Sequence, residues 1–95
     1  MTSDVKMPLE DLLLCLDDLE YLVPSLAQIG SASLGHEERA LELQRFAIEG
    51  NVFRRLATMR NRLTLVLEAQ LSKAEVERFD ARMEKIETWK VRSTQ

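Results

Sequence analysis

The feature that most constrains this chain is a run of apolar residues at alternating spacings of three and four: Leu9, Leu12, Leu16, Leu19, Val23 and Leu26. This spacing keeps one apolar stripe on a single side of an α-helix, as the a and d positions do in bundles and coiled coils. Leu13, Leu22 and Ile29 widen the stripe beyond a contact between two helices. The run therefore predicts a helix over about residues 8–29 that packs against more than one neighbour.

Two prolines mark this first helix. Pro8 suits the first turn of a helix, and Glu10 and Asp11 then place negative charge at the positive end of the helix dipole. Pro24 lies inside the run, where it cannot donate a hydrogen bond to the carbonyl four residues earlier and clashes with it, at a cost of about 3 kcal/mol. We expect the helix to bend or to be split near Pro24.

A second apolar run follows the loop-like residues 30–35, a connection of the length that joins antiparallel helices. Residues 36–71 contain no proline, and the part of their stripe that we expect to form an oligomer seam with the first run is Leu56, Met59, Leu63 and Val66. The pattern skips at Gly50–Asn51, where glycine costs roughly 1 kcal/mol relative to alanine, so we expect a local irregularity. The simplest prediction is one continuous helix over residues 36–71.

A capping box marks the last segment. Ser72 and Glu75 have the S-x-x-E spacing in which the two side chains satisfy backbone N–H groups at the start of a helix. The apolar pattern changes phase here and resumes at Val76, Phe79, Met83, Ile86 and Trp89. Either the chain turns near Leu71–Ser72 into a third helix over residues 73–91, or one long helix presents two stripes in different directions.

This last stripe is the candidate partner-binding site. Large aromatic side chains such as Phe79 and Trp89 are enriched where one protein anchors on another. The alternative is that the stripe caps the core of its own chain. We predict that it binds a protein partner.

The fold class follows from these runs and the composition. The 95 residues include sixteen leucines but three glycines and two prolines, so turns are scarce, and residues that favour strands are few. We predict a single all-α domain, an antiparallel helical hairpin with a long second helix. The first helix would span roughly 33 Å and residues 36–91 roughly 84 Å. The uncovered length predicts homo- or hetero-oligomerisation as a coiled coil or helical bundle.

Charge is segregated along the chain. Residues 1–35 carry six acidic and one basic side chains, whereas residues 36–62 carry six basic and four acidic ones. In a hairpin closed at residues 30–35, the acids near the middle of the first helix lie level with residues 45–55; they are Asp17, Asp18 and Glu20. We expect cross-helix ion pairs, each under about 1 kcal/mol, with three arginines of the second run: Arg45, Arg54 and Arg55.

Catalytic motifs do not stand out in the sequence. His36 is the only histidine and Cys15 the only cysteine, which leaves no Cys/His metal set and no Cys–His or Ser–His–Asp arrangement. A glycine-rich phosphate loop is also missing from the sequence. We predict that the protein is not an enzyme and that it uses no cofactor and no metal.

A basic cluster raises the possibility of nucleic-acid binding; it consists of Arg54, Arg55, Arg60 and Arg62. The net charge of −3 and the acidic first run argue against that function. A small nucleic-acid-binding regulator is therefore the second alternative.

The expected compartment is intracellular, cytoplasmic or nuclear. A single cysteine cannot form an internal disulfide, and the first residues lack the pattern of a signal peptide. No apolar stretch approaches the ~18 residues that cross a bilayer, so we expect no membrane association.

The leading functional prediction is a non-enzymatic protein–protein interaction subunit, a scaffold or adaptor. It would assemble through the seams at residues 9–26 and 56–66 and present residues 76–89 to a partner. The first alternative is a small helical chaperone for a secreted or aggregation-prone partner, whose groove would be filled only on binding.

Overall fold

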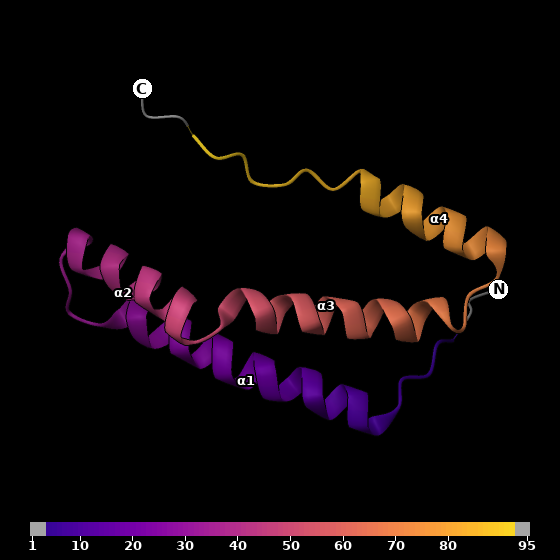
Figure 1. The fold of residues 1–95 in the computed structure, drawn as a ribbon, viewed down its shortest axis with the longest axis horizontal. Helices are drawn as coiled ribbons and strands as arrows, with labels where there is room; N and C mark the ends of the chain where they lie inside the picture. The colour runs from indigo at the N-terminus through magenta and orange to yellow at the C-terminus, as the bar shows by residue number, and fades with distance from the viewer. Residues whose placement is uncertain (1–3, 93–95) are drawn as a thin grey trace.

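In the computed structural model, which describes residues 4–92, these residues form four α-helices (Figure 1). They are α1 (Leu9–Ser31), α2 (His36–Glu49), α3 (Val52–Glu68) and α4 (Lys73–Glu84). The described residues contain no strand, and the all-α prediction is confirmed.

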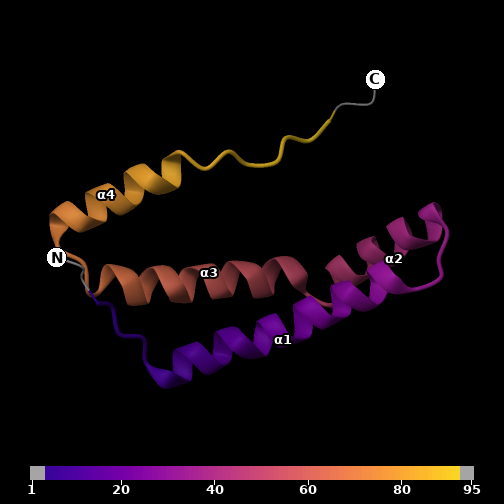
Figure 2. The ribbon, with the colours of Figure 1, turned by 180° about the vertical axis from the view of Figure 1, so that it is seen from behind.

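α1 runs antiparallel to α2 and α3, which follow each other along its length (Figures 1 and 2). Arg39 of α2 closes the connection between α1 and α2, because its guanidinium donates to the carbonyl oxygens of Ile29 at 3.4 Å and Ala32 at 2.8 Å. The last turn of α1 contains no basic residue. Arg39 therefore supplies both the donors and the positive charge that the carboxyl end of a helix favours.

α1 passes through Pro24 without a break, so of the two expected outcomes, a bend or a split, the split does not occur. Proline removes one hydrogen bond from the helix, but Leu22 is buried and Ile29 is half-buried on either side of it. Packing on both sides of Pro24 holds the helix together, since tertiary contacts contribute more to helix stability than intrinsic propensity does.

The continuous helix predicted over residues 36–71 is wrong, because the chain breaks between α2 and α3. Asn51 adopts a left-handed conformation with φ 51° and ψ 39°, which asparagine tolerates better than most residues. Gly50 is buried, and a Cβ atom there would lie 2.7 Å from the carbonyl oxygen of Phe46. The skipped position at Gly50–Asn51 thus marked the end of one helix and the start of the next.

The predicted capping box is present at the start of α4. The Glu75 backbone N–H donates to Ser72 Oγ at 3.2 Å, and the Ser72 backbone N–H donates to a Glu75 carboxylate oxygen at 2.9 Å. The chain therefore turns before residue 73, and α4 folds back along α3 (Figure 1).

α4 ends at Glu84, so the helix predicted to residue 91 is too long. Residues 86–92 are not helical, and Ile86 and Trp89 are 59% and 81% exposed. Nothing in the described chain packs against one side of this segment closely enough to stabilise a further helical turn.

The interior of the described chain is small. Its buried apolar side chains are Cys15, Leu22 and Met59. The radius of gyration is 17.5 Å, against about 12 Å for a compact domain of this length. The accessible surface is 8477 Å², against about 5,600 Å² for a folded monomer of this mass. The isolated chain therefore exposes roughly 2,900 Å² more surface than a compact monomer would.

Candidate interaction surface

The contact between α1 and α3 uses a heptad pattern that lies one residue out of phase with the leucine run. On α1 the buried or half-buried positions of this pattern are Asp11, Cys15, Asp18, Leu22, Ser25 and Ile29, of which Ser25 and Ile29 line a hollow with α2. On α3 the pattern consists of Val52, Arg55, Met59, Arg62 and Val66. The half-buried Leu14 of α1 and the half-buried Thr64 and Leu67 of α3 lie outside it. We call these two sets the inner seam. Sequence reasoning missed the phase of the seam on α1 because two of its six positions are acidic.

Ion pairs alternate with apolar layers along the inner seam. Arg55 pairs with Asp18 at 2.9 Å, and Arg62 pairs with Asp11 at 3.2 Å. Asp11 and Asp18 are seven residues apart, as are Arg55 and Arg62, so each pair sits at an equivalent position two helical turns along. That matched spacing of opposite charges was the sequence signal for the seam.

Of the expected cross-helix pairs, the structure contains the one between Asp18 and Arg55. Arg45 pairs within α2 instead, with Glu42 at 3.2 Å and Glu49 at 3.1 Å. Arg54 has no ion pair within residues 4–92. The helices are in the expected register, but one of the three arginines pairs across to α1.

Arg55 also connects three helices. Its Nε donates to the carbonyl oxygen of Gly50 at 3.0 Å, at the end of α2. Its guanidinium carbon lies 4.1 Å from the centre of the Tyr21 ring on α1, close enough for a cation–π interaction. The break between α2 and α3 is therefore held by the same residue that pairs with Asp18.

The leucine run faces away from the inner seam. Its members between residues 12 and 26 are 38% to 59% exposed, and Leu9 is 69% exposed. We call the five members of this run between residues 12 and 26 the leucine stripe: Leu12, Leu16, Leu19, Val23 and Leu26. The predicted oligomer seam on α1 is thus left open to solvent by the rest of the described chain.

The predicted seam on α3 is divided between two surfaces. Met59 is buried at 8% exposure and Val66 is half-buried, and both belong to the inner seam. Leu56 and Leu63 are each 47% exposed. They follow inner-seam positions by one residue, as the leucine stripe does on α1.

The leucine stripe of α1 and the exposed Leu56 and Leu63 of α3 lie on the same side of the helix pair. One residue corresponds to a rotation of about 100° around a helix axis. Because α1 and α3 are antiparallel, this rotation carries the residue after each seam position to the same side on both helices. The opposite side is more polar and includes Asp17, Thr58 and Asn61. The pair is amphipathic, with one apolar face.

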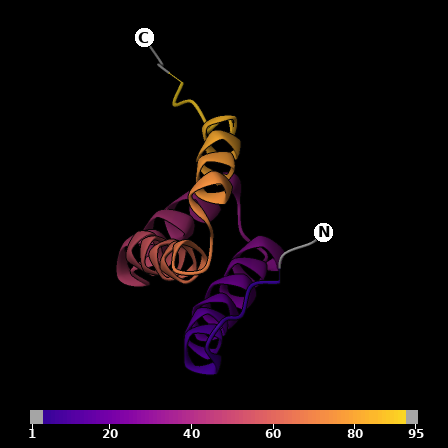
Figure 3. The same cartoon turned by 90° about the vertical axis from the view of Figure 1, so that its right-hand side faces the viewer.

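α4 lies over part of this face and forms a groove with α3. The groove has a volume of about 390 Å³ and is lined by Leu56, Met59, Arg60, Leu63, Thr64, Leu67, Phe79 and Met83. Viewed along the molecule, α3 stands at the corner between α1 and α4 (Figure 3). We call this space the apolar groove. Together with the leucine stripe, it makes up the apolar face of the chain.

The predicted partner-binding residues divide at the end of α4. Phe79 and Met83 line the apolar groove, and Val76 is half-buried on the same helix. Ile86 and Trp89 lie beyond the helix, and Ile86 contributes to a second hollow of about 510 Å³ beside Phe79. The structure does not bring the five residues together as one helical stripe.

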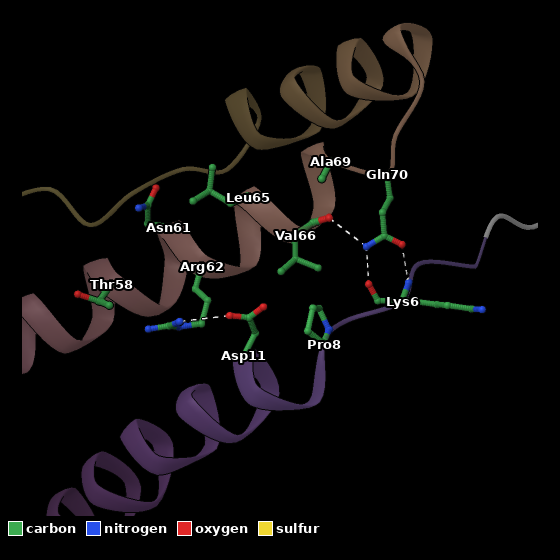
Figure 4. A pocket seen from close by; sticks show the side chains of 10 residues that line it. All are labelled: Lys6, Pro8, Asp11, Thr58, Asn61, Arg62, Leu65, Val66, Ala69 and Gln70. Atoms are coloured by element: carbon green, nitrogen blue, oxygen red, sulfur yellow. Dashed lines mark hydrogen bonds and ion pairs between the residues drawn. The ribbon is translucent and has the colours of Figure 1, made fainter.

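A hollow of about 530 Å³ on the polar side joins the first described residues to the end of α3 (Figure 4). The Lys6 backbone N–H donates to Gln70 Oε1 at 2.7 Å, and Gln70 Nε2 donates to the carbonyl oxygens of Lys6 and, at 3.1 Å, Val66. One amide side chain thus anchors the segment that precedes α1. The sequence carries no local pattern that predicts this contact.

Comparison with protein family models, curated proteins and solved structures finds no match for this chain. Within residues 4–92 no group of three or more His, Cys, Asp or Glu side chains is arranged to hold a metal ion. None of the helices in that part of the chain is long and apolar enough to cross a membrane.

Proposed function

We propose that the protein is a non-enzymatic interaction subunit, a scaffold or adaptor that joins other helical chains through its apolar face. The observation that carries this proposal is the exposure of the leucine stripe beside the apolar groove. Contiguous apolar surface of this kind is unusual on a monomeric protein and is typical of surfaces that bind other proteins.

The segment after α4 supplies a second contact in this proposal. Trp89 is 81% exposed, and Ile86 is 59% exposed. Tryptophan is among the residues that most often dominate the binding energy of an interface. Residues 86–89 are therefore presented to a protein partner while the apolar face assembles the subunit.

The basic cluster gives less support to nucleic-acid binding. Arg55 and Arg62 are engaged by Asp18 and Asp11 in the inner seam. Arg54 and Arg60 are six residues apart, which places them about 120° apart around α3. A phosphate backbone would meet two separated charges rather than a continuous basic stripe.

A chaperone for an aggregation-prone partner is the second candidate, and the open apolar groove between α3 and α4 favours it. A chaperone groove is filled only when its client binds, so a client peptide would raise the melting temperature of the folded chain markedly. A permanent subunit would instead purify with its partner and show little further stabilisation.

The test of the leading proposal is affinity capture from cell lysate with the full chain as bait. Ile86→Ala combined with Trp89→Ala should abolish recovery of partners and leave helicity by circular dichroism unchanged, because neither residue belongs to a helix. Val91→Ala is the matched control, since Val91 is 90% exposed in the same segment. Full recovery of every partner by the double variant would contradict this role for residues 86–89.

A further inference from the structure

We infer that the apolar face joins two copies of this chain, with the leucine stripe of each copy seated in the apolar groove of the other. The inference rests on the proposed function and names the first partner of the apolar face. It follows from the exposed surface, the matching dimensions of the two elements, and the distribution of charge.

The exposed surface requires an extensive interface. The chain leaves roughly 2,900 Å² more surface in water than a compact monomer of its mass. A standard interface covers only about 800 Å² on each partner, whereas obligate homodimers bury more and resemble a domain core cut in half. A second copy covers both the stripe and the groove of each chain in one association.

The two elements match in length. The leucine stripe extends over fifteen residues from Leu12 to Leu26, whose fourteen steps span about 21 Å of helix. On α3, the apolar positions of the same face extend from the exposed Phe53 to the half-buried Leu67, also fifteen residues and about 21 Å. The stripe of one copy can therefore lie along α3 of the other over its whole length, as helices do in a bundle of two helix pairs.

Charge selects α3, rather than α1, as the helix that the stripe meets. α1 contains five acids and no lysine or arginine, whereas α3 contains four arginines and one acid, Glu68. Arg60 lines the groove, and Glu20 follows Leu19 of the stripe by one residue. Neither Arg60 nor Glu20 has an ion pair within residues 4–92. Two α1 helices side by side would repel, whereas α1 against α3 brings opposite charges together.

The resulting dimer is reciprocal, with two equivalent contacts related by a twofold axis. This reciprocity provides a specific test. Leu16→Glu damages the stripe, and Leu63→Glu damages the groove, so each variant alone loses both contacts of the dimer. A mixture of the two variants regains one contact, between the intact stripe of the Leu63 variant and the intact groove of the Leu16 variant.

The experiment is sedimentation equilibrium at tens of micromolar protein. The wild-type chain should have twice its 10.9 kDa mass, each variant should sediment at 10.9 kDa, and their equimolar mixture should contain the heterodimer. Gln28→Glu and Leu65→Glu are the controls, because both add the same charge at exposed positions of the same helices, one residue before an inner-seam position and so on the side opposite the apolar face. Both controls should remain dimers.

Three results would overturn the inference: a monomeric wild-type chain, dissociation by the controls as well, or a variant mixture that stays monomeric. If the variants lose helicity on their own, circular dichroism of the mixture replaces sedimentation. Recovered helicity supports the reciprocal contact, and the plain average of the two spectra contradicts it.

Failure of this inference is distinguishable from failure of the proposed function. A monomeric chain whose capture of another protein is lost with Leu16→Glu would exclude the second copy but support an interaction surface at the apolar face. A monomeric chain that captures no protein would contradict both.

Discussion

The inner seam and the leucine stripe are two heptad surfaces of the same helix, and they are used in opposite ways. The inner seam of α1 contains two aspartates and a serine among its six positions, yet it makes the contacts with α3. The leucine stripe contains only leucine and valine, yet each of its residues is at least 38% exposed. The more apolar surface is therefore the one that the chain leaves uncovered.

The difference shows how a small helical chain can use one surface to align its own helices and leave another available for association. An ion pair that is partly buried contributes little net stability, but a misaligned charge is costly, so such pairs fix the alignment of two helices. An apolar stripe contributes more free energy when covered but tolerates more than one alignment. In this chain the charged seam aligns α1 with α3, and the stripe remains available for association.

The largest effect is expected when the same charge is placed in each surface, which tests directly whether the inner seam and the leucine stripe have different roles. Leu22→Asp puts a carboxylate at a 4% exposed position of the inner seam, next to Asp18, and should cost at least about 3 kcal/mol. Leu16→Asp places it at a 42% exposed position of the stripe and should dissociate the assembly while α1 and α3 stay paired. Thermal melts followed by circular dichroism at low concentration separate the two effects. Equal loss of helicity in both variants would show that the two surfaces are not distinct.

The next largest effect should come from a substitution of Arg55, which measures how much the charged positions of the inner seam contribute to stability. Arg55→Ala removes the ion pair with Asp18, the hydrogen bond to Gly50 and the stacking on Tyr21. We expect a loss of about 2 kcal/mol in the free energy of unfolding, reduced from a fully buried case because the side chain is 35% exposed.

Arg62→Ala is the control for Arg55→Ala, because Arg62 pairs with Asp11 but has no ring beneath it. It should cost under about 1 kcal/mol. Denaturant melts give both values. A larger loss of stability for Arg62→Ala than for Arg55→Ala would show that the ion pairs determine the loss, and that the contacts of Arg55 with Gly50 and Tyr21 add nothing to it.

The break between α2 and α3 offers a third test, since α2 and α3 both pack on α1 and the break lies between them. Gly50→Ala would place a Cβ atom 2.7 Å from the Phe46 carbonyl oxygen, and we expect a cost of about 1–2 kcal/mol. Gly30→Ala has no atom within 4 Å of the new Cβ and should stabilise α1 by roughly 0.5–1 kcal/mol. A lower melting temperature for Gly50→Ala together with a higher one for Gly30→Ala would confirm both expectations, and shifts of the same sign would contradict them.

The parts of this fold that the sequence predicts are those encoded locally. Helix 1, the loop after it and the capping box at Ser72 each depend on residues within one or two turns of one another, and all three are present. The apolar pattern visibly skips a position at Gly50–Asn51. Because no proline lies there, the sequence does not distinguish a break at a left-handed Asn51 from a continuous helix that tolerates one glycine.

The surface that faces α3 could not be predicted from apolar periodicity. The leucine run gives the stronger pattern, and periodicity alone favours it as the intrachain contact. The correct seam depends on charges 37 and 51 residues apart, between Asp18 and Arg55 and between Asp11 and Arg62. The clamp of Gln70 on Lys6 joins residues 64 apart, and no local propensity encodes it. Contacts of this kind become evident only when the fold is known.

The smallest expected effect concerns α4, which forms one wall of the apolar groove. Ser72→Ala removes the side-chain acceptor of the Glu75 N–H and should cost about 1 kcal/mol. No core residue of the described chain lies in α4, so the loss should be confined to this helix. Amide hydrogen exchange should accelerate in residues 73–84 and stay unchanged in α1 and α3. Ser33→Ala, in the loop before α2, is the control, because its side chain has no hydrogen bond within residues 4–92 and the N-cap of α2 is Gly35, which has no side chain to bond. If exchange accelerates equally throughout the chain, α4 belongs to the same cooperative unit as the inner seam, and the groove is part of the core rather than a surface laid over it.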